Sequence, residues 1–103
     1  MAAIETQLTA IASTRTPYLN RVFMVTGTLT ADGPVPGKMI WLFDGANTKL
    51  AAALTGIDGR YRMCLEAQYD QLLFVRFEGD EIYDSAASAE IGITVENGRL
   101  EGR

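Results

Sequence analysis

The chain has 103 residues, 48% of them hydrophobic, and carries a formal net charge of −4 from nine basic and thirteen acidic side chains. A chain of this length is expected to form one domain that buries enough surface to fold without a metal or a disulfide. Scattered basic residues in an acidic chain argue against nucleic acid as a partner. No apolar run approaches the roughly 20 residues that cross a bilayer, so we expect no membrane insertion of this domain.

Histidine is absent from the sequence. The Ser-His-Asp and Cys-His forms of nucleophilic catalysis need an imidazole base, and the commonest zinc sites need an imidazole ligand. The single cysteine, Cys64, cannot form an internal disulfide, so the usual chemical mark of a small secreted domain is missing. Residues 1–12 lack the pattern of a signal peptide. From the absence of histidine we expect a protein that is not an enzyme and that has no catalytic residue, metal or cofactor.

Short hydrophobic runs separated by turn residues predict an all-β fold. Turn signals such as Asp32-Gly33-Pro34, Asp44-Gly45 and Asp58-Gly59 recur at the interval typical of a β-sandwich. The seven strand-like runs lie near residues 5–12, 21–31, 38–44, 48–55, 60–66, 71–78 and 89–96. The fourth run also has good helix propensity from Asn47 to Leu54, but two turns of helix are marginal alone, so we favour a strand.

Two of these runs alternate between apolar and polar residues, which assigns their inner faces. The inward set comprises Phe23, Val25, Gly27 and Leu29 in the second run and Tyr61, Met63 and Leu65 in the fifth. Threonines mark the outer face of the second run, and Arg60, Arg62, Cys64 and Glu66 that of the fifth. Such one-sided strands need a second sheet to cover them. The pattern predicts a sandwich of about seven antiparallel strands with Greek-key connections.

The third run does not alternate, because Met39, Ile40, Trp41, Leu42 and Phe43 are all apolar. We place Ile40 and Leu42 in the core. The opposite face, with Met39, Trp41 and Phe43, then needs a cover, which is the end strand, the following run, or another domain or subunit. These three residues are the candidate contacts for a ligand or a protein partner.

Residues 72–95 are predicted to form a strand, an acidic turn, a short loop and a second strand. The two apolar sets that alternate are Leu73, Val75 and Phe77, then Ile91, Ile93 and Val95. Gly79 permits a positive φ where the first strand ends, and Asp80 can accept bonds from nearby backbone N–H groups. Tyr83 can lay its ring across the end of the sandwich and bond its hydroxyl locally. We expect two antiparallel core strands closed by a structural hairpin motif of Phe77, Gly79, Asp80 and Tyr83.

Three segments resemble the immunoglobulin-like repeat domains of bacterial and archaeal surface proteins. The first runs from Gly27 to Leu42 and contains a Gly-Pro-rich turn followed by Gly-Lys-x-Ile-x-Leu. The second, from Thr55 to Arg62, is similar to the family's Thr-x-x-x-Gly-x-Tyr hairpin. The third is the closing hairpin motif. The Asp58-Gly59 turn before Tyr61 also resembles transthyretin-like, carboxypeptidase-regulatory domains, a neighbouring class of β-sandwich.

The resemblance implies an immunoglobulin-like sandwich over residues 1–96, with residues 97–103 as a polar tail or linker stub. It further implies a non-catalytic spacer or adhesion module within a larger cell-surface or phage-surface protein. The domain would then be extracellular, and its partner would be another protein or the neighbouring domains. These motifs are tied to turn geometry, so they specify fold better than function.

Two local groups offer alternative chemistry. Glu78, Asp80, Glu81 and Asp84 gather around the closing turn, where paired carboxylates can serve a glycosidase or bind calcium. Their spacing matches no calcium loop, and a solvated turn is the favoured interpretation. Cys64 lies on the predicted outer face with Arg60 and Arg62, which suggests a reactive thiol, although an ordinary half-buried cysteine is favoured.

Trp41 supports the main functional alternative, a carbohydrate-binding module. An exposed tryptophan with Tyr18, Tyr69 or Tyr83 nearby can form a stacking platform for sugar rings. Met39 and Phe43 on the same face suit a protein contact better, because sugar sites want polar groups beside the ring. A glycan partner therefore stays open, but burial of Trp41 against other protein atoms is favoured.

Overall fold

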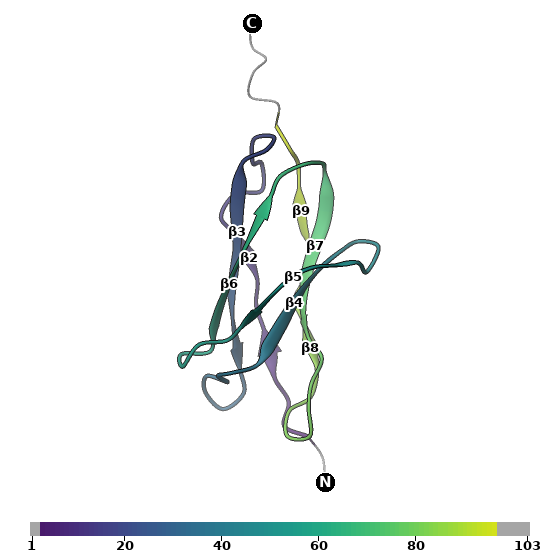
Figure 1. The fold of residues 1–103 in the computed structure, drawn as a ribbon. Coiled ribbons are helices and arrows are strands. Elements are labelled where there is room, and N and C mark those ends of the chain that lie inside the picture. Colours follow the sequence, from purple (N-terminus) through teal and green to yellow (C-terminus); the bar gives the residue numbers. More distant parts are fainter. Residues whose placement is uncertain (1–2, 97–103) are drawn as a thin grey trace, which may run out of the picture.

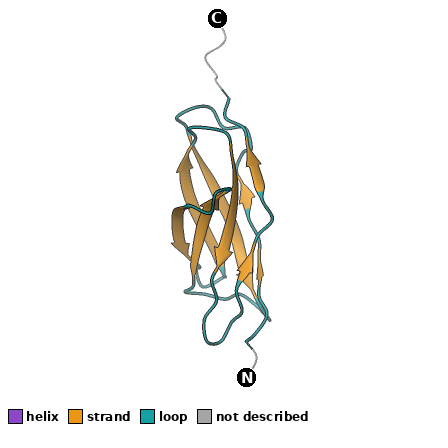
Figure 2. Cartoon of the chain, turned by 90° about the vertical axis from the view of Figure 1, so that its right-hand side faces the viewer, coloured by secondary structure: helices purple, strands orange, loops and turns teal. Residues whose placement is uncertain are grey.

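The computed structural model describes residues 3–96, which form nine β-strands and no helix. The strands make two antiparallel sheets that pack face to face, as Figures 1 and 2 show. The prediction of an all-β sandwich is confirmed. The predicted polar tail, residues 97–103, lies outside the described residues. Within the described part of the chain, no helix is long and apolar enough to span a membrane.

The first sheet is built around the longest strand, β3 (Val22–Thr30). On one side β3 pairs with β1 (Gln7–Leu8) and β2 (Ile11–Ala12), and on the other with β6 (Arg60–Glu66). All three pairings are antiparallel. The β3–β6 register sets Val25 opposite Met63 and Gly27 opposite Tyr61, so the residues predicted to face inward on these two strands share one face.

The second sheet has the strand order β5–β4–β7–β8, with β9 also paired to β7. Its strands are β4 (Met39–Asp44), β5 (Lys49–Leu54), β7 (Gln71–Phe77), β8 (Ala86–Ala87) and β9 (Ile91–Ile93). The alanine-rich segment at β5 is a strand, as expected, because β4 supplies backbone partners that an isolated helix would lack. The antiparallel pairing of β7 with β9 confirms the two core strands predicted in the closing segment.

The core lies between the two sheets and follows the predicted alternation. Ile40 and Leu42 of β4 are fully buried, as expected, and so are Leu73 and Val75 of β7. The other buried core members are Leu8, Phe23, Val25, Leu29, Val35, Tyr61, Met63, Ala67, Phe77, Ile91 and Ile93. Burial of these side chains is the main favourable term that holds the sheets together.

The prediction of one strand over residues 5–12 is wrong in detail, because the ladder is interrupted between β1 and β2. The register against β3 is continuous, but the carbonyl of Thr9 turns away and accepts a hydrogen bond from the Tyr61 hydroxyl. The Thr9 hydroxyl takes the place of that carbonyl and accepts the bond from the Thr28 N–H at 3.0 Å. A Cβ at Gly27 would overlap the Thr9 carbonyl oxygen, so only glycine fits there.

The last predicted strand, 89–96, is likewise shorter than expected, and β8 precedes it unpredicted. Between β8 and β9 the register against β7 shifts by one residue, which marks a β-bulge. The Ser88 hydroxyl lies in this bulge and accepts a hydrogen bond from the Val75 N–H at 3.0 Å. A side-chain hydroxyl therefore replaces a backbone carbonyl as hydrogen-bond acceptor at two places, Thr9 between β1 and β2 and Ser88 between β8 and β9.

Backbone bonds join the segment before β3 to the C-terminal segment and close one side of the sandwich. Near one pole the Ile4 N–H bonds the Ile82 carbonyl and the Asp84 N–H bonds the Ile4 carbonyl, both at 2.8 Å. Near the other pole, Glu96 exchanges bonds with residues 17 and 19, and the Thr94 N–H bonds the Arg15 carbonyl. The bridges at both poles are parallel. The coloured ribbon accordingly begins and ends at opposite poles (Figure 1).

Candidate functional site

The outer face of β4 carries the three residues singled out from the sequence. Met39, Trp41 and Phe43 alternate with the buried Ile40 and Leu42, so they project away from the core. Their exposure differs along the strand. Met39 is 40% exposed and Trp41 is half-buried, whereas Phe43 is only 4% exposed even though it lies on the outside. Something on this face therefore covers Phe43.

The cover of Phe43 comes from the adjacent strand β7. Phe74 lies directly opposite in the ladder, and the two rings stack with centroids 5.3 Å apart and an angle of 11° between their planes. The guanidinium of Arg76, also on β7, lies 5.3 Å from the Phe43 ring centroid. Stacking and cation–π contact each favour this arrangement. The outer face of β4 is thus covered at this end by residues of the same domain.

Trp41 is covered from the other neighbouring strand, β5. The Lys49 ammonium lies 4.1 Å from the Trp41 ring centroid, and 3.9 Å from a carboxylate oxygen of Glu78. A register shift between Leu42 and Phe43 makes this possible, because it sets Lys49 opposite Phe43. We call Trp41, Phe43, Phe74, Lys49 and Arg76 together the aromatic layer.

The aromatic layer occupies the surface on which a stacking platform for sugar rings was considered. One face of the Trp41 ring is occupied by Lys49, and the contacts that the structure records for Trp41 within residues 3–96 include no tyrosine ring. Tyr18 bridges to Glu96, and the exposed Tyr69 lies between β6 and β7. Tyr83 follows β7 and packs on the core. The structure brings Trp41 together with cationic side chains and a phenylalanine pair instead.

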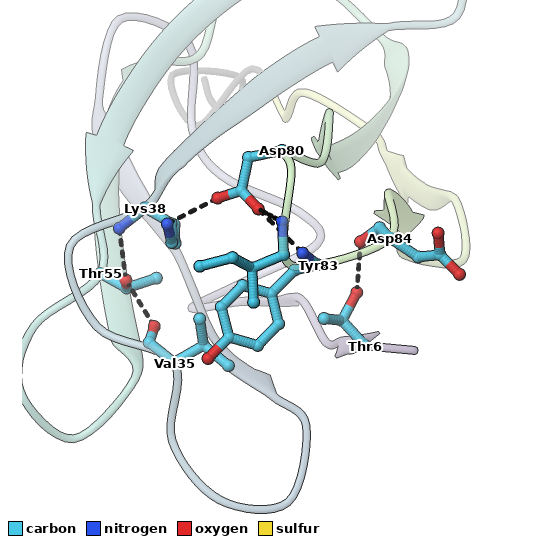
Figure 3. A network of polar contacts seen from close by, with 8 residues as sticks. Thr6, Val35, Lys38, Thr55, Asp80, Tyr83 and Asp84 are labelled. Carbon is cyan, nitrogen blue, oxygen red and sulfur yellow. Dashed lines mark hydrogen bonds and ion pairs between the residues drawn. The ribbon is translucent and has the colours of Figure 1, made fainter. Parts of the chain in front are cut away.

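The turn after β7 contains the residues of the predicted closing hairpin motif, and Figure 3 shows this region. Gly79 has φ of +85°, the left-handed conformation that favours glycine, and a Cβ there would lie 2.9 Å from the Ser85 nitrogen. One Asp80 carboxylate oxygen accepts the N–H groups of Ile82 and Tyr83, both at 2.8 Å. Phe77 is buried at the start of this turn. These contacts give Asp80 the turn-forming role expected of it.

Asp80 also joins the turn to the loop before β4. Its second carboxylate oxygen forms an ion pair with Lys38, and the Lys38 ammonium lies 5.5 Å from the Tyr83 ring centroid. The hydrogen bond from Lys38, followed by those from the backbone of Tyr83 and Ile82, lowers the pKa of Asp80 to about 2. The backbone N–H of Lys38 donates to the hydroxyl of the buried Thr55, which in turn donates to the Val35 carbonyl at 2.7 Å (Figure 3).

The acidic residues around this turn point to different partners. Glu78 faces Lys49 and Asp80 faces Lys38, while the backbone of Asp84 bonds Ile4 and the Thr6 hydroxyl. Across residues 3–96 no group of three or more Cys, Asp or Glu side chains is placed to hold a metal ion. Elsewhere, Cys64 is exposed on the outer face of the first sheet, opposite Met24 of β3.

No protein-family model matches the chain, and no curated protein is a significant match to it. The immunoglobulin-like resemblance therefore rests on the sequence motifs alone. Sequence reasoning singled out Trp41 and Phe43 but missed Lys49, Phe74 and Arg76. Alternation in β7 was the available signal for two of them, because Phe74 and Arg76 fall between the inward residues of that strand.

Proposed function

We propose that this domain is a non-catalytic structural and interaction module, a spacer or adhesion domain of a larger cell-surface or phage-surface protein. The observation that carries the proposal is the course of the chain. Figures 1 and 2 show the described chain starting at one pole of the sandwich and leaving at the other. A module of this shape can be placed in series with others, and each copy adds its own length to the assembly.

The bonds between the two terminal segments support a role under tension. Five backbone hydrogen bonds join residues 4–19 to residues 82–96, two near the first pole and three near the second. The bridged segments run parallel, so a pull on the two ends slides one segment along the other. Bonds that cross the direction of pulling must then break together rather than one at a time. Such a geometry resists extension better than one that peels apart.

Single-molecule pulling tests this proposal. The domain is placed between two marker domains and stretched through its ends. We expect one cooperative unfolding event at high force. Ile4→Pro removes the N–H that bonds Ile82 and should lower the unfolding force. Asp80→Asn is the matched control, because it weakens the turn at the same pole and leaves the terminal backbone bonds in place.

Unfolding at the same low force whether the domain is pulled through its ends or through handles on β3 and β6 would contradict the spacer role. The cellular part of the proposal needs a separate test. An antibody against the domain should label intact cells or virions of the source, and brief protease treatment of those cells should remove the label. Labelling that appears only after permeabilisation would overturn the surface assignment.

A further inference from the structure

A shallow hollow of about 680 Å³ lies over the first sheet and extends to the end of β5. Its lining comes from β2, β3 and β6 and from the end of β5. Thr26 and Thr28 of β3 contribute hydroxyls. Ile11 and Leu54 also line it, and both are exposed, at 67% and 60%. The volume lies within the range of ligand-binding clefts.

Two arginines give the hollow a positive charge in an acidic protein. Arg60 and Arg62 lie two residues apart on β6, so they share its outer face, and they stand opposite Thr28 and Thr26. Among residues 3–96, no acidic side chain lines the hollow. Arg60 has one loose, exposed ion pair with Asp58 at 3.8 Å, whereas Arg62 has no carboxylate within 4 Å among residues 3–96. The guanidinium groups are thus open to an external anion.

We propose that this hollow binds an extended acidic peptide segment with carboxylates at alternate positions. Side chains two residues apart on a strand are separated by about 7 Å, and this holds equally for Arg60 and Arg62 and for alternate residues of an extended peptide. Two carboxylates of such a peptide therefore meet two guanidinium groups in register. Guanidinium–carboxylate pairs can be bidentate, and such pairs select the orientation of the carboxylate as well as its charge.

The remaining lining suits the same occupant. Ile11 and Leu54 offer contacts to apolar side chains of the peptide, and the Thr26 hydroxyl offers a hydrogen bond to its backbone, whereas the Thr28 hydroxyl already lies 3.1 Å from that of Thr9. A flexible chain of uronic acids carries the same anionic group, but it lacks the apolar side chains that these two residues would contact. The proposal goes beyond the spacer role, which needs no ligand and would stand if this site were disproved.

The test is a titration of the ¹⁵N-labelled domain followed by NMR, with the acetylated peptide Thr-Glu-Val-Glu-Thr. We expect shifts confined to β2, β3, β6 and the end of β5. Removing both guanidinium groups with R60Q/R62Q should weaken binding about tenfold or more. The control R15Q/R21Q removes the same charge outside the hollow and should change the affinity less than about twofold. Unchanged thermal melting would show that both variants are folded.

Two further peptides separate charge from spacing. Thr-Gln-Val-Gln-Thr should not bind, and Thr-Glu-Glu-Val-Thr, with adjacent carboxylates, should bind more weakly than the alternating peptide. Equal losses of peptide affinity in R60Q/R62Q and R15Q/R21Q would overturn the site, because they would indicate only general charge attraction. Tighter binding of oligogalacturonate than of the alternating peptide would overturn the peptide assignment. Shifts centred on the aromatic layer would also contradict the proposal.

Discussion

At the scale of single residues, the first sheet depends on an exchange of hydrogen-bond acceptors at Thr9. The Thr9 carbonyl leaves the ladder to accept the Tyr61 hydroxyl, and the Thr9 side chain supplies the acceptor that Thr28 would otherwise lack. No backbone donor is stranded by the exchange. Burial raises the pKa of Tyr61, so its hydroxyl stays protonated and can donate up to strongly alkaline pH.

Gly27 makes this exchange possible, so we predict that Gly27→Ala destabilises the domain by about 2–3 kcal/mol, because the methyl overlaps the Thr9 backbone. Urea unfolding followed by circular dichroism measures the change. Gly33→Ala is the matched control, since a Cβ there meets nothing within 4 Å. Equal unfolding midpoints for the two variants would show that the carbonyl can move aside at little cost.

Asp80 gives the fold an acid-sensitive turn. Its pKa is about 2 in the folded protein and 3.8 in the absence of these contacts. A lowered pKa means that its contribution to stability is complete above about pH 5 and is lost as the pH falls from about 4 to 2. We predict that wild type and Asp80→Asn differ in unfolding free energy at pH 7 and converge near pH 2. Urea unfolding across this range tests it, with Asp32→Asn as the control. A constant difference from pH 7 to pH 2 would contradict the role of Lys38.

At the scale of strands, the aromatic layer explains how a strand with two apolar faces is accommodated. Ile40 and Leu42 pack in the core, while Phe43 packs under Phe74 and Arg76. Long cationic side chains can lay their stems over apolar surface and keep their charge in water. The second apolar face of β4 is therefore partly covered from within the domain, and this reduces the surface left for a partner.

We predict that Lys49 shields Trp41. Because the ammonium lies over the ring, Lys49→Ala should increase quenching of tryptophan fluorescence by acrylamide, a neutral quencher. Glu78→Gln is the control, since it removes the ion pair but leaves Lys49 over the ring. Trp41 is the sole tryptophan, so the signal has one source. Equal quenching in wild type and Lys49→Ala would mean that the ring is covered by something else.

The strands also show what the sequence can and cannot predict. Alternation found the faces of β3, β6 and β7, because burial on one face leaves a period of two. The apolar run of β4 does not alternate, so the correct placement of Ile40 and Leu42 in the core did not rest on that signal. It missed the interruptions at Thr9 and Ser88. A hydroxyl that replaces a carbonyl does not change the apolar pattern, so no periodic signal marks it. The cover of Trp41 was also invisible, because Lys49 reaches the ring through a register shift that only pairing defines.

At the scale of the whole molecule, the two sides of the sandwich differ. On one side the terminal segments are bonded to each other, and their ladders are broken by Thr9 and Ser88. Interrupted outer strands are poor templates for pairing with another chain. The opposite side ends in β5 and β6, which pair only with β4 and β3 in the described chain. The charged residues of β6 protect its edge, and they also line the hollow proposed to bind an acidic peptide.

The bonds between the first and last segments set the order in which the domain can be completed. During synthesis the residues before β3 emerge first, yet their partners at residues 82–96 emerge last. Sequence-distant pairing of this kind slows folding, and the early segment waits without its native neighbour. In a tandem array, the matching segment of the next copy would present the same backbone groups soon afterwards. Divergence in sequence between adjacent copies would then protect each domain from exchanging its terminal strand with the next.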